Sequence, residues 1–229
     1  MRALLLSAGY GTRLKPITDN IPKCLVPING KILMDYWLEQ LTEAGVNRFL
    51  INTHYLSEKV EKYITSSKYA NQIDIFFEKN LLKTAGTILA NKKYFEDETF
   101  MLVHADNLSI CNFADFIAAH ENRPSGTEIT MMTFKTDNPS SCGIVELDKS
   151  GIVYDFHEKK QNPPSSLANA AVYIIEPSVV KYIESIGKKN LDFSEDIIPN
   201  FLGKINTFFN DKYHRDIGNI ESYSISQIE

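Results

Sequence analysis

Short apolar segments alternate with amphipathic segments over the first hundred residues, and this alternation most constrains the fold. The apolar run at residues 3–6 ends in a glycine-containing loop at 7–11. Residues 32–44 carry apolar side chains at helical spacing, and Gly45 stands where a helix would end. Further strands are expected at 49–51, 73–77 and 100–103, and further helices at 56–64 and 85–92. This order predicts a parallel sheet with helices on both faces.

The pattern changes after Glu121, where strand-like segments follow one another through polar turns. The expected strands are 128–134, 143–147, 153–157, 170–175 and 207–210, and 178–186 is an expected helix. Hairpin-like turns add antiparallel pairs, so the predicted fold class is α/β: a Rossmann-like three-layer α/β/α sandwich with a mixed, mostly parallel central sheet. With no composition break along the chain, we expect one domain over 1–229, with halves of about 1–120 and 121–229.

The composition indicates which partners and which cellular location to expect for the protein. The 229 residues include 24 Lys+Arg and 29 Asp+Glu, so the net charge is −5, and we expect no nucleic-acid partner. The three cysteines, Cys24, Cys111 and Cys142, lie far apart and form no disulfide framework, which favours a reducing cytoplasm. The apolar run at the N-terminus is far shorter than the ~20 residues of a membrane span. We therefore expect a cytoplasmic protein with no membrane partner.

The loop after the first strand has the chemistry of a phosphate site. Gly9 and Gly11 allow backbone N–H groups to approach an anion, and Arg13 adds a forked cation. Lys23, beside Pro22, adds a point charge. The loop is neither a P-loop nor a dinucleotide fingerprint, so on spacing alone a plain tight turn also remains open.

The run Gly9-Tyr10-Gly11-Thr12-Arg13-Leu14, followed by Ile21-Pro22-Lys23, resembles the N-terminal signature of the sugar-1-phosphate nucleotidylyltransferases. The chain departs mildly, with Ser7-Ala8-Gly9 where that family often has Ala-Gly-Gly. The resemblance implies that Arg13 and Lys23 are catalytic, neutralising the leaving phosphates and the α-phosphate respectively. It also implies that the triphosphate is cradled by Ala8, Gly9, Gly11 and Thr12.

Lys83-Thr84-Ala85-Gly86-Thr87 resembles the segment that in this family lies against the nucleobase and ribose. Thr84, Ala85 and Gly86 would then bind the nucleotide. Lys83 replaces a glycine, which leaves the choice of nucleotide open. A helix start with Thr84 as its N-cap would show the same residues.

Asp106 follows an apolar strand, at the edge where open α/β sheets bind ligands, although an aspartate there is also a common turn former. By resemblance, Asp106 would hold a divalent cation. Asp216, in the stretch 213–218, would be the second carboxylate on this metal. The cofactor would be Mg²⁺, with Mn²⁺ as an alternative. Because 110 residues separate the two aspartates, only the fold can bring them together.

Asp155-Phe156-His157-Glu158-Lys159 resembles the family segment that contacts the sugar phosphate. Glu158 would accept hydrogen bonds from sugar hydroxyls, and Lys159 would face the 1-phosphate. Lys160 replaces the proline of the family, so we expect a less fixed backbone there. The resemblance adds two more residues to this sugar-phosphate set: Gly143 would allow the backbone to approach the sugar closely, and Asn169 would hydrogen-bond the sugar.

Together these segments imply an enzyme that transfers a nucleotidyl group from an NTP to a sugar 1-phosphate, in sugar-nucleotide and polysaccharide biosynthesis. The stretches 162–169, 192–199 and 216–218 resemble the mannose-1-phosphate and heptose-1-phosphate guanylyltransferase branch, which favours GTP. Cytidylyl, uridylyl and thymidylyl transfer, a non-sugar acceptor and a non-catalytic nucleotide-binding relative stay open, as does a homodimer. Three residues are expected to be structural: a hydrogen-bonded His54, a surface His120 and a packed Cys24.

Overall fold

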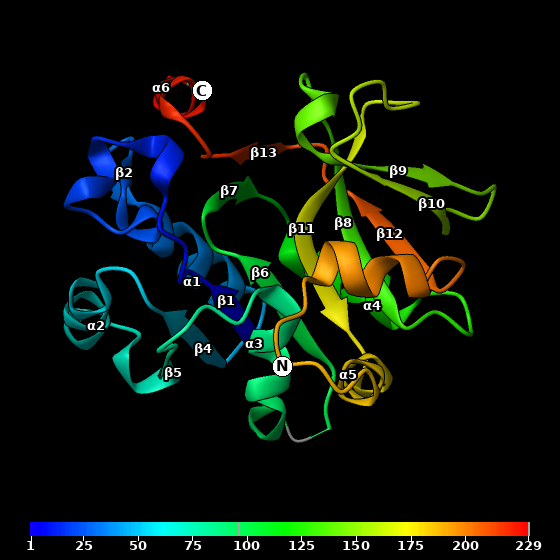
Figure 1. Ribbon diagram of the computed structural model, residues 1–229, viewed down its shortest axis with the longest axis horizontal. Helices are drawn as coiled ribbons and strands as arrows, with labels where there is room; N and C mark the ends of the chain where they lie inside the picture. The colour runs from blue at the N-terminus through cyan, green and yellow to red at the C-terminus, as the bar shows by residue number, and fades with distance from the viewer. Residues whose placement is uncertain (96, 229) are drawn as a thin grey trace. The chain divides into compact units, whose positions relative to one another are not determined.

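The computed structural model describes residues 1–95 and 97–228, which form two compact units. The first unit comprises Met1–Leu81, Val103–Phe113 and Lys212–Glu229, and the second comprises Leu82–Leu102 and Ala114–Asp211. The units therefore interleave along the chain instead of dividing it near residue 120. Figure 1 traces the strands and helices of both. The predicted fold class is confirmed as α/β, with a mixed central sheet and flanking helices.

The first unit is built on parallel strands. β1 (Arg2–Leu6) pairs with β4 (Arg48–Thr53), and β4 pairs with β5 (Ile73–Phe77). Two amphipathic helices belong to this unit, α1 (Leu33–Glu43) and α2 (Ser57–Ser66), and α2 contacts β5. The centre of β1 is fully buried, as expected for a strand covered on both faces. These elements match the expected segments closely.

Several short elements of the first unit were not predicted. β2 (Pro27–Ile28) pairs with β3 (Lys31–Ile32), and β7 (Asn107–Ile110) pairs antiparallel with β13 (Tyr213–Asp216), which precedes α6 (Ile220–Ser226). They enclose a small apolar cluster of Leu14, Val26, Ile28, Leu33, Leu108 and Ile217. Segments of two to four residues carry too little periodicity to be recognised in a sequence, and their stability comes from this shared cluster.

The second unit holds the antiparallel pairs that the later turns predicted. β9 (Gly143–Leu147) pairs antiparallel with β10 (Val153–Glu158), and β8 (Ile129–Lys135) pairs antiparallel with β11 (Leu167–Ile175). β12 (Ile205–Phe209) pairs parallel with β8. β6 (Phe100–His104) is divided between the two units, because Leu102 ends a segment of the second unit and Val103 begins a segment of the first. The helices are α3 (Thr84–Ala90), α4 (Phe113–Glu121), whose first residue lies in the first unit, and α5 (Pro177–Ser185).

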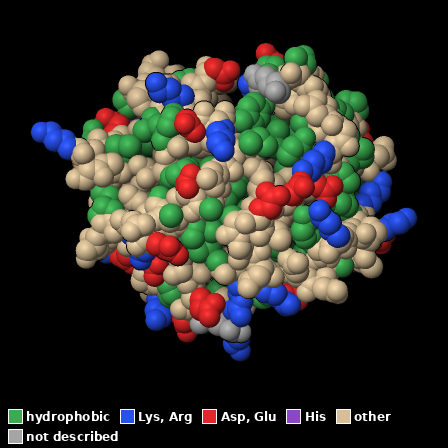
Figure 2. All heavy atoms as spheres, turned by 180° about the vertical axis from the view of Figure 1, so that it is seen from behind, with side chains coloured by type: hydrophobic (Ala, Val, Ile, Leu, Met, Phe, Trp, Pro, Cys, Tyr) green, Lys and Arg blue, Asp and Glu red, His purple; other side chains and the backbone are tan. Residues whose placement is uncertain are grey.

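The described surface carries charges of both signs. On the face shown in Figure 2, basic and acidic side chains lie interspersed with apolar ones. Within residues 1–95 and 97–228, none of the helices has the length and apolar character needed to cross a bilayer.

The expected surface position of His120 is wrong, because this side chain is buried on α4 with 3% of its area exposed. Its Nδ1 lies 2.8 Å from Thr130 Oγ1, and its Nε2 lies 2.9 Å from Glu176 Oε1. Arg123 Nη2 donates to the same Glu176 oxygen at 2.8 Å. Burial lowers the pKa of His120 below its ordinary 6.5, despite the nearby Glu176 carboxylate. The partners are far apart along the chain, so no local pattern of residues predicts this network.

We expect His120 to make the protein less stable on acidification. A lowered pKa means that the unfolded chain binds a proton below about pH 6.5 that the folded chain does not bind, so the free energy of unfolding falls as the pH falls. His120→Gln keeps a donor for Glu176 but does not titrate. Urea unfolding between pH 7.5 and 5.5 should show a shallower decline for this variant, by up to about 1.4 kcal/mol per pH unit. Equal slopes would contradict the assignment.

Candidate active site

The glycine loop begins at a residue tied to the neighbouring strand. Ser7 N–H donates to Asn52 Oδ1 at 2.7 Å, and Ser7 Oγ donates to Asn52 O at 2.6 Å. Asn52 Nδ2 in turn donates to Glu78 Oε1, 2.9 Å away, just after β5. The loop is thus anchored to the carboxyl ends of β4 and β5. Asn52 and Glu78 are not among the predicted residues, because a polar side chain at the end of a strand is their only signal in the sequence.

Gly11 and Gly9 serve this loop in different ways. Gly11 has a φ of +63°, and a Cβ there would lie 2.9 Å from Thr18 Cγ2 and 3.3 Å from Lys23 Cβ. Thr18 Oγ1 also donates to Gly11 O at 2.8 Å. Gly11 is therefore required by the fold of the loop. A Cβ on Gly9 would meet nothing within 4 Å, so this residue leaves open space beside the loop.

Four predicted residues meet in one charged cluster of the first unit: Arg13, Lys23, Asp106 and Asp216. Lys23 Nζ donates to Asp106 Oδ2 at 2.7 Å and to Asp216 Oδ1 at 3.4 Å, and the lysine side chain is only 8% exposed. Arg13 Nη2 lies 3.8 Å from Asp216 Oδ2 with a largely exposed guanidinium. The fold thus brings Lys23 to both candidate metal ligands and Arg13 to Asp216.

The β7–β13 pair brings the two aspartates together. Asp106 lies between β6 and β7, where Ala105 N–H donates to Leu6 O of β1 at 3.0 Å. In the antiparallel register Asp216 stands opposite Asn107, the residue after Asp106. Trp37 Nε1, on α1, donates to Asn107 O at 2.8 Å and holds β7 in place. One strand pairing therefore brings Asp106 and Asp216 together, although 110 residues separate them in the sequence.

The cluster is charged at neutral pH. Burial lowers the pKa of Lys23, but the carboxylates of Asp106 and Asp216 outweigh burial and raise it, so the side chain remains an ammonium. Burial raises the pKa of Asp106, but the positive charge of Lys23 and its hydrogen bond to the carboxylate act in the opposite direction, so the pKa of this carboxyl is lowered. Two carboxylates that both point at one ammonium already share a cation. Hard oxygen ligands in this arrangement fit Mg²⁺.

The predicted nucleobase segment belongs to the second unit, where its backbone is already engaged. The N–H groups of Ala85 and Gly86 donate to Leu191 O at 2.9 and 3.0 Å. Thr84 Oγ1 accepts from Phe193 N–H at 2.6 Å and donates to Asp192 Oδ2 at 3.3 Å. These contacts hold α3 against the segment that follows α5. A role in binding the nucleotide stays a prediction for these residues.

The predicted sugar-phosphate residues lie on β9, β10 and β11 or directly after them. Gly143 stands opposite Glu158 in the β9–β10 register, and a Cβ on Gly143 would lie 2.7 Å from Glu158 Oε2. Lys159 Nζ lies 2.9 Å from Glu158 Oε1 and is 66% exposed. Asn169 accepts from Ala171 N–H at 2.9 Å and donates to Tyr173 Oη at 2.6 Å. The second unit therefore groups Gly143 with Glu158 and Lys159, and their contact with a sugar stays a prediction.

Two structural expectations are confirmed. Both ring nitrogens of His54 are engaged, Nδ1 at 2.8 Å from Glu78 O and Nε2 at 2.9 Å from Tyr10 Oη. Cys24 is 1% exposed, and burial raises the pKa of its thiol to about 12, so it packs as a neutral side chain.

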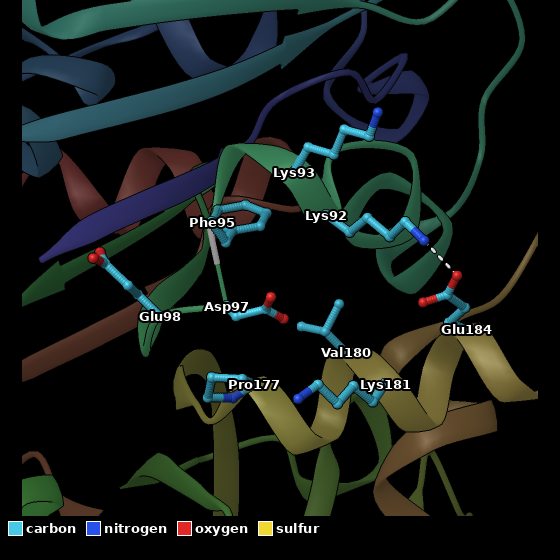
Figure 3. A pocket seen from close by; sticks show the side chains of 9 residues that line it. All are labelled: Lys92, Lys93, Phe95, Asp97, Glu98, Pro177, Val180, Lys181 and Glu184. Atoms are coloured by element: carbon cyan, nitrogen blue, oxygen red, sulfur yellow. Dashed lines mark hydrogen bonds and ion pairs between the residues drawn. The ribbon is translucent and has the colours of Figure 1, made fainter.

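A pocket of the second unit involves none of the predicted residues. It lies between the turn Lys92–Tyr94 and α5, and Figure 3 shows Lys92 reaching Glu184 across it. Three lysines and three acidic residues line it, so their formal charges balance.

Comparison with known proteins gives a consistent result. The family model described as nucleotidyl transferase matches residues 2–227. A UTP–glucose-1-phosphate uridylyltransferase of Synechocystis sp. is 30% identical over 97% of this chain. A mannose-1-phosphate guanylyltransferase catalytic subunit beta of Drosophila pseudoobscura pseudoobscura is 34% identical over 80% of it. The aligned regions span 61% and 50% of the lengths of these relatives.

A solved structure agrees with the sequence matches. The crystal structure of HddC from Yersinia pseudotuberculosis complexed with GMP-PN is similar to this chain, with a TM-score of 0.82 and 25% identity. The similarity covers 99% of this chain and 97% of that one.

The two loop glycines give a matched pair of variants. Gly11→Ala should lower the free energy of unfolding by about 1–3 kcal/mol, because it forces a side chain into a positive φ and against Thr18. Gly9→Ala should change it by less than about 0.5 kcal/mol. Urea unfolding of both variants checks this, and an unaffected Gly11→Ala would show that the loop tolerates a different conformation.

Proposed function

Since the chain belongs to the nucleotidyl transferase family, we propose that it transfers the nucleotidyl group of an NTP to a sugar 1-phosphate and releases pyrophosphate. The observation that carries this proposal is the charged cluster in which the Lys23 ammonium contacts the carboxylates of Asp106 and Asp216, and Arg13 lies beside Asp216. Two cations and two carboxylates at the carboxyl end of β1 and β6 suit a polyphosphate substrate with its metal ion.

The chemistry demands positioning and charge neutralisation rather than a strong base. An oxygen of the sugar 1-phosphate attacks the α-phosphorus of the NTP, a new P–O bond forms, and the bond to the β-phosphate oxygen breaks. The attacking phosphate is already ionised near neutral pH, so no proton has to be removed. The protein accelerates the step by alignment and by stabilising the charge that develops on the phosphates.

The glycine loop and its cations would hold the triphosphate. The backbone of Ala8, Gly9, Gly11 and Thr12 offers N–H groups beside the open space at Gly9. The exposed guanidinium of Arg13 would bind the phosphates that leave as pyrophosphate. The buried ammonium of Lys23 would stabilise charge at the α-phosphate.

Asp106 and Asp216 would hold the divalent cation, for which we propose Mg²⁺, with Mn²⁺ as the alternative. When bound, this ion would neutralise phosphate charge and orient the reacting groups. The two carboxylates already point at Lys23 Nζ, at 2.7 and 3.4 Å, which supports their joint use on a cation.

The acceptor would lie on β9–β11 of the second unit. Glu158 and Asn169 would accept or donate hydrogen bonds to sugar hydroxyls, and Lys159 would bind the 1-phosphate. Because Gly143 has no side chain, the sugar could approach the backbone at this position closely. Thr84, Ala85 and Gly86 would contribute to the nucleotide site through α3.

GTP is the nucleotide that we propose first. A guanylyltransferase among the relatives and the similarity to HddC, whose structure holds GMP-PN, both support a guanine nucleotide. The uridylyltransferase relative, which aligns with 97% of the chain, makes UTP with glucose 1-phosphate the second candidate. The cytoplasm remains the expected location.

A substrate panel tests the proposal. The protein would be incubated with Mg²⁺, one of GTP, UTP, dTTP, CTP or ATP, and one of several hexose, aminohexose and heptose 1-phosphates. Pyrophosphate release with the mass of an NDP-sugar is the expected result, strongest with GTP. Preference for UTP would replace guanylyl by uridylyl transfer, and no release from any pair would overturn the proposed activity.

Asp106→Asn should reduce kcat/KM by at least about a hundredfold, because it removes one carboxylate from the proposed cation site. The matched control is Asp137→Asn, which changes an exposed loop aspartate. Since Asp106 also partners the buried Lys23, thermal unfolding would be measured on the same samples, and Asp216→Asn would serve as the more exposed second variant. Near-normal turnover in both folded variants would contradict the metal assignment.

A further inference from the structure

The residue proposed to bind the acceptor phosphate has an unusual backbone. Lys159 directly follows β10 and has a φ of +47°, a conformation that favours glycine. Its N–H donates to Cys142 O at 3.1 Å, next to β9. A lysine persists in such a conformation only where its neighbours determine it.

The residues on either side of Glu158 and Lys159 are joined through their side chains. Lys160 Nζ lies 2.9 Å from His157 Nδ1. An ammonium has no acceptor, so Nδ1 accepts this hydrogen bond and the ring proton is on Nε2. Nε2 donates to Glu146 Oε1 at 2.7 Å. The side chains of His157 and Lys160 therefore close a bridge over the two residues between them, which we name the His157–Lys160 clip.

The inner end of the clip is fixed to the β9–β10 hairpin. Glu146 stands opposite Asp155 in the register, so Glu146 and His157 share one face of the hairpin. Tyr154 Oη donates to Glu146 Oε2 at 2.9 Å. Hydrogen bonds from His157 and Tyr154 lower the pKa of Glu146, which keeps it an anionic acceptor at neutral pH. His157 is 9% exposed, whereas Lys160 is an exposed residue.

We propose that the His157–Lys160 clip holds the turn at Lys159 and thereby positions the ammonium of Lys159 for the phosphate of the acceptor. His157 and Lys160 are positioning residues in this arrangement, and neither needs to touch the substrate. The clip supplies the rigidity that a proline at 160 would otherwise give, so the backbone is more fixed than the sequence alone led us to expect. This inference rests on the proposed function, because it requires that Lys159 bind the sugar phosphate.

The same face of the hairpin also satisfies the distances of a metal site. Ligand atoms of Glu146, Asp155 and His157 lie within 4.8 Å of one another. A metal ion on His157 would need the lone pair of Nε2, but the hydrogen bond from Lys160 to Nδ1 leaves Nε2 protonated. The contacts therefore favour a hydrogen-bonded clip over a cation site, and the metal alternative becomes an outcome of the test.

Lys160→Met keeps an unbranched side chain of similar length and removes the ammonium that forms the clip. It should raise the KM for the sugar 1-phosphate about three- to tenfold, the value of one hydrogen bond, while kcat and the KM for the NTP stay within about twofold. Lys149→Met, at the exposed turn of the same hairpin, is the matched control and should change none of these constants.

Two substitutions of His157 distinguish the effect of its hydrogen bond with Lys160 from the effect of its hydrogen bond with Glu146. His157→Asn keeps an acceptor near the position of Nδ1, so it should keep the KM of the unchanged protein for the sugar phosphate. His157→Gln keeps a donor near Nε2 for Glu146 but loses the clip, so it should match Lys160→Met. Thermal unfolding would be measured for both, and a KM that follows stability rather than the clip would overturn the inference.

Lys159→Met distinguishes failure of the inference from failure of the proposed function. If Lys159→Met raises the KM for the sugar phosphate and Lys160→Met does not, the clip has no positioning role. If Lys159→Met has no effect either, the proposed phosphate contact itself fails, and the clip has nothing to position. Calorimetry with Zn²⁺ or Mn²⁺ adds a third arm, since binding that is lost in His157→Ala would replace the clip by a cation site.

Discussion

The ion pair between the buried Lys23 ammonium and the carboxylates of Asp106 and Asp216 is the constraint on which the first unit depends. A lysine that is 8% exposed needs compensation for the water it has lost, and two carboxylates supply it. Each partner is held by a different element: a short turn for Lys23, the connection between β6 and β7 for Asp106, and β13 for Asp216. The glycine loop lies against the same lysine, because Gly11 passes close to Lys23 Cβ.

Close contacts with charged side chains explain why glycine stands at two positions, Gly218 and Gly143. A Cβ on Gly218 would lie 3.1 Å from Arg13 Nη2 and would also collide with the Asp216 carboxylate. In the second unit, a Cβ on Gly143 would collide with the carboxylate of Glu158, which lies 2.7 Å from that position. Each of these glycines allows a charged side chain to approach the backbone closely. Both units thus hold charged side chains close to the bare backbone of a glycine.

Much of the fold could be predicted because its larger elements have clear periodicity. The strand at 73–77 and the helices near 33–43 and 177–185 follow directly from apolar spacing. The pairs β2–β3 and β7–β13 could not be found in this way, since strands of two to four residues are stabilised by a shared apolar cluster and not by their own pattern. His120 was misplaced for a related reason, because its burial depends on Thr130 and Glu176.

By itself, the sequence determined the α/β class, the family and the identity of the charged residues, because these follow from local spacing and from motifs of adjacent residues. Only the tertiary structure decided which of those residues meet. Asp106 and Asp216 share one ammonium because an antiparallel pairing brings them together across 110 residues. Lys160, which stands where the family has a proline, contacts His157 through its side chain. Contacts of this kind depend on the register of strands and the direction of side chains, which no local pattern of residues encodes.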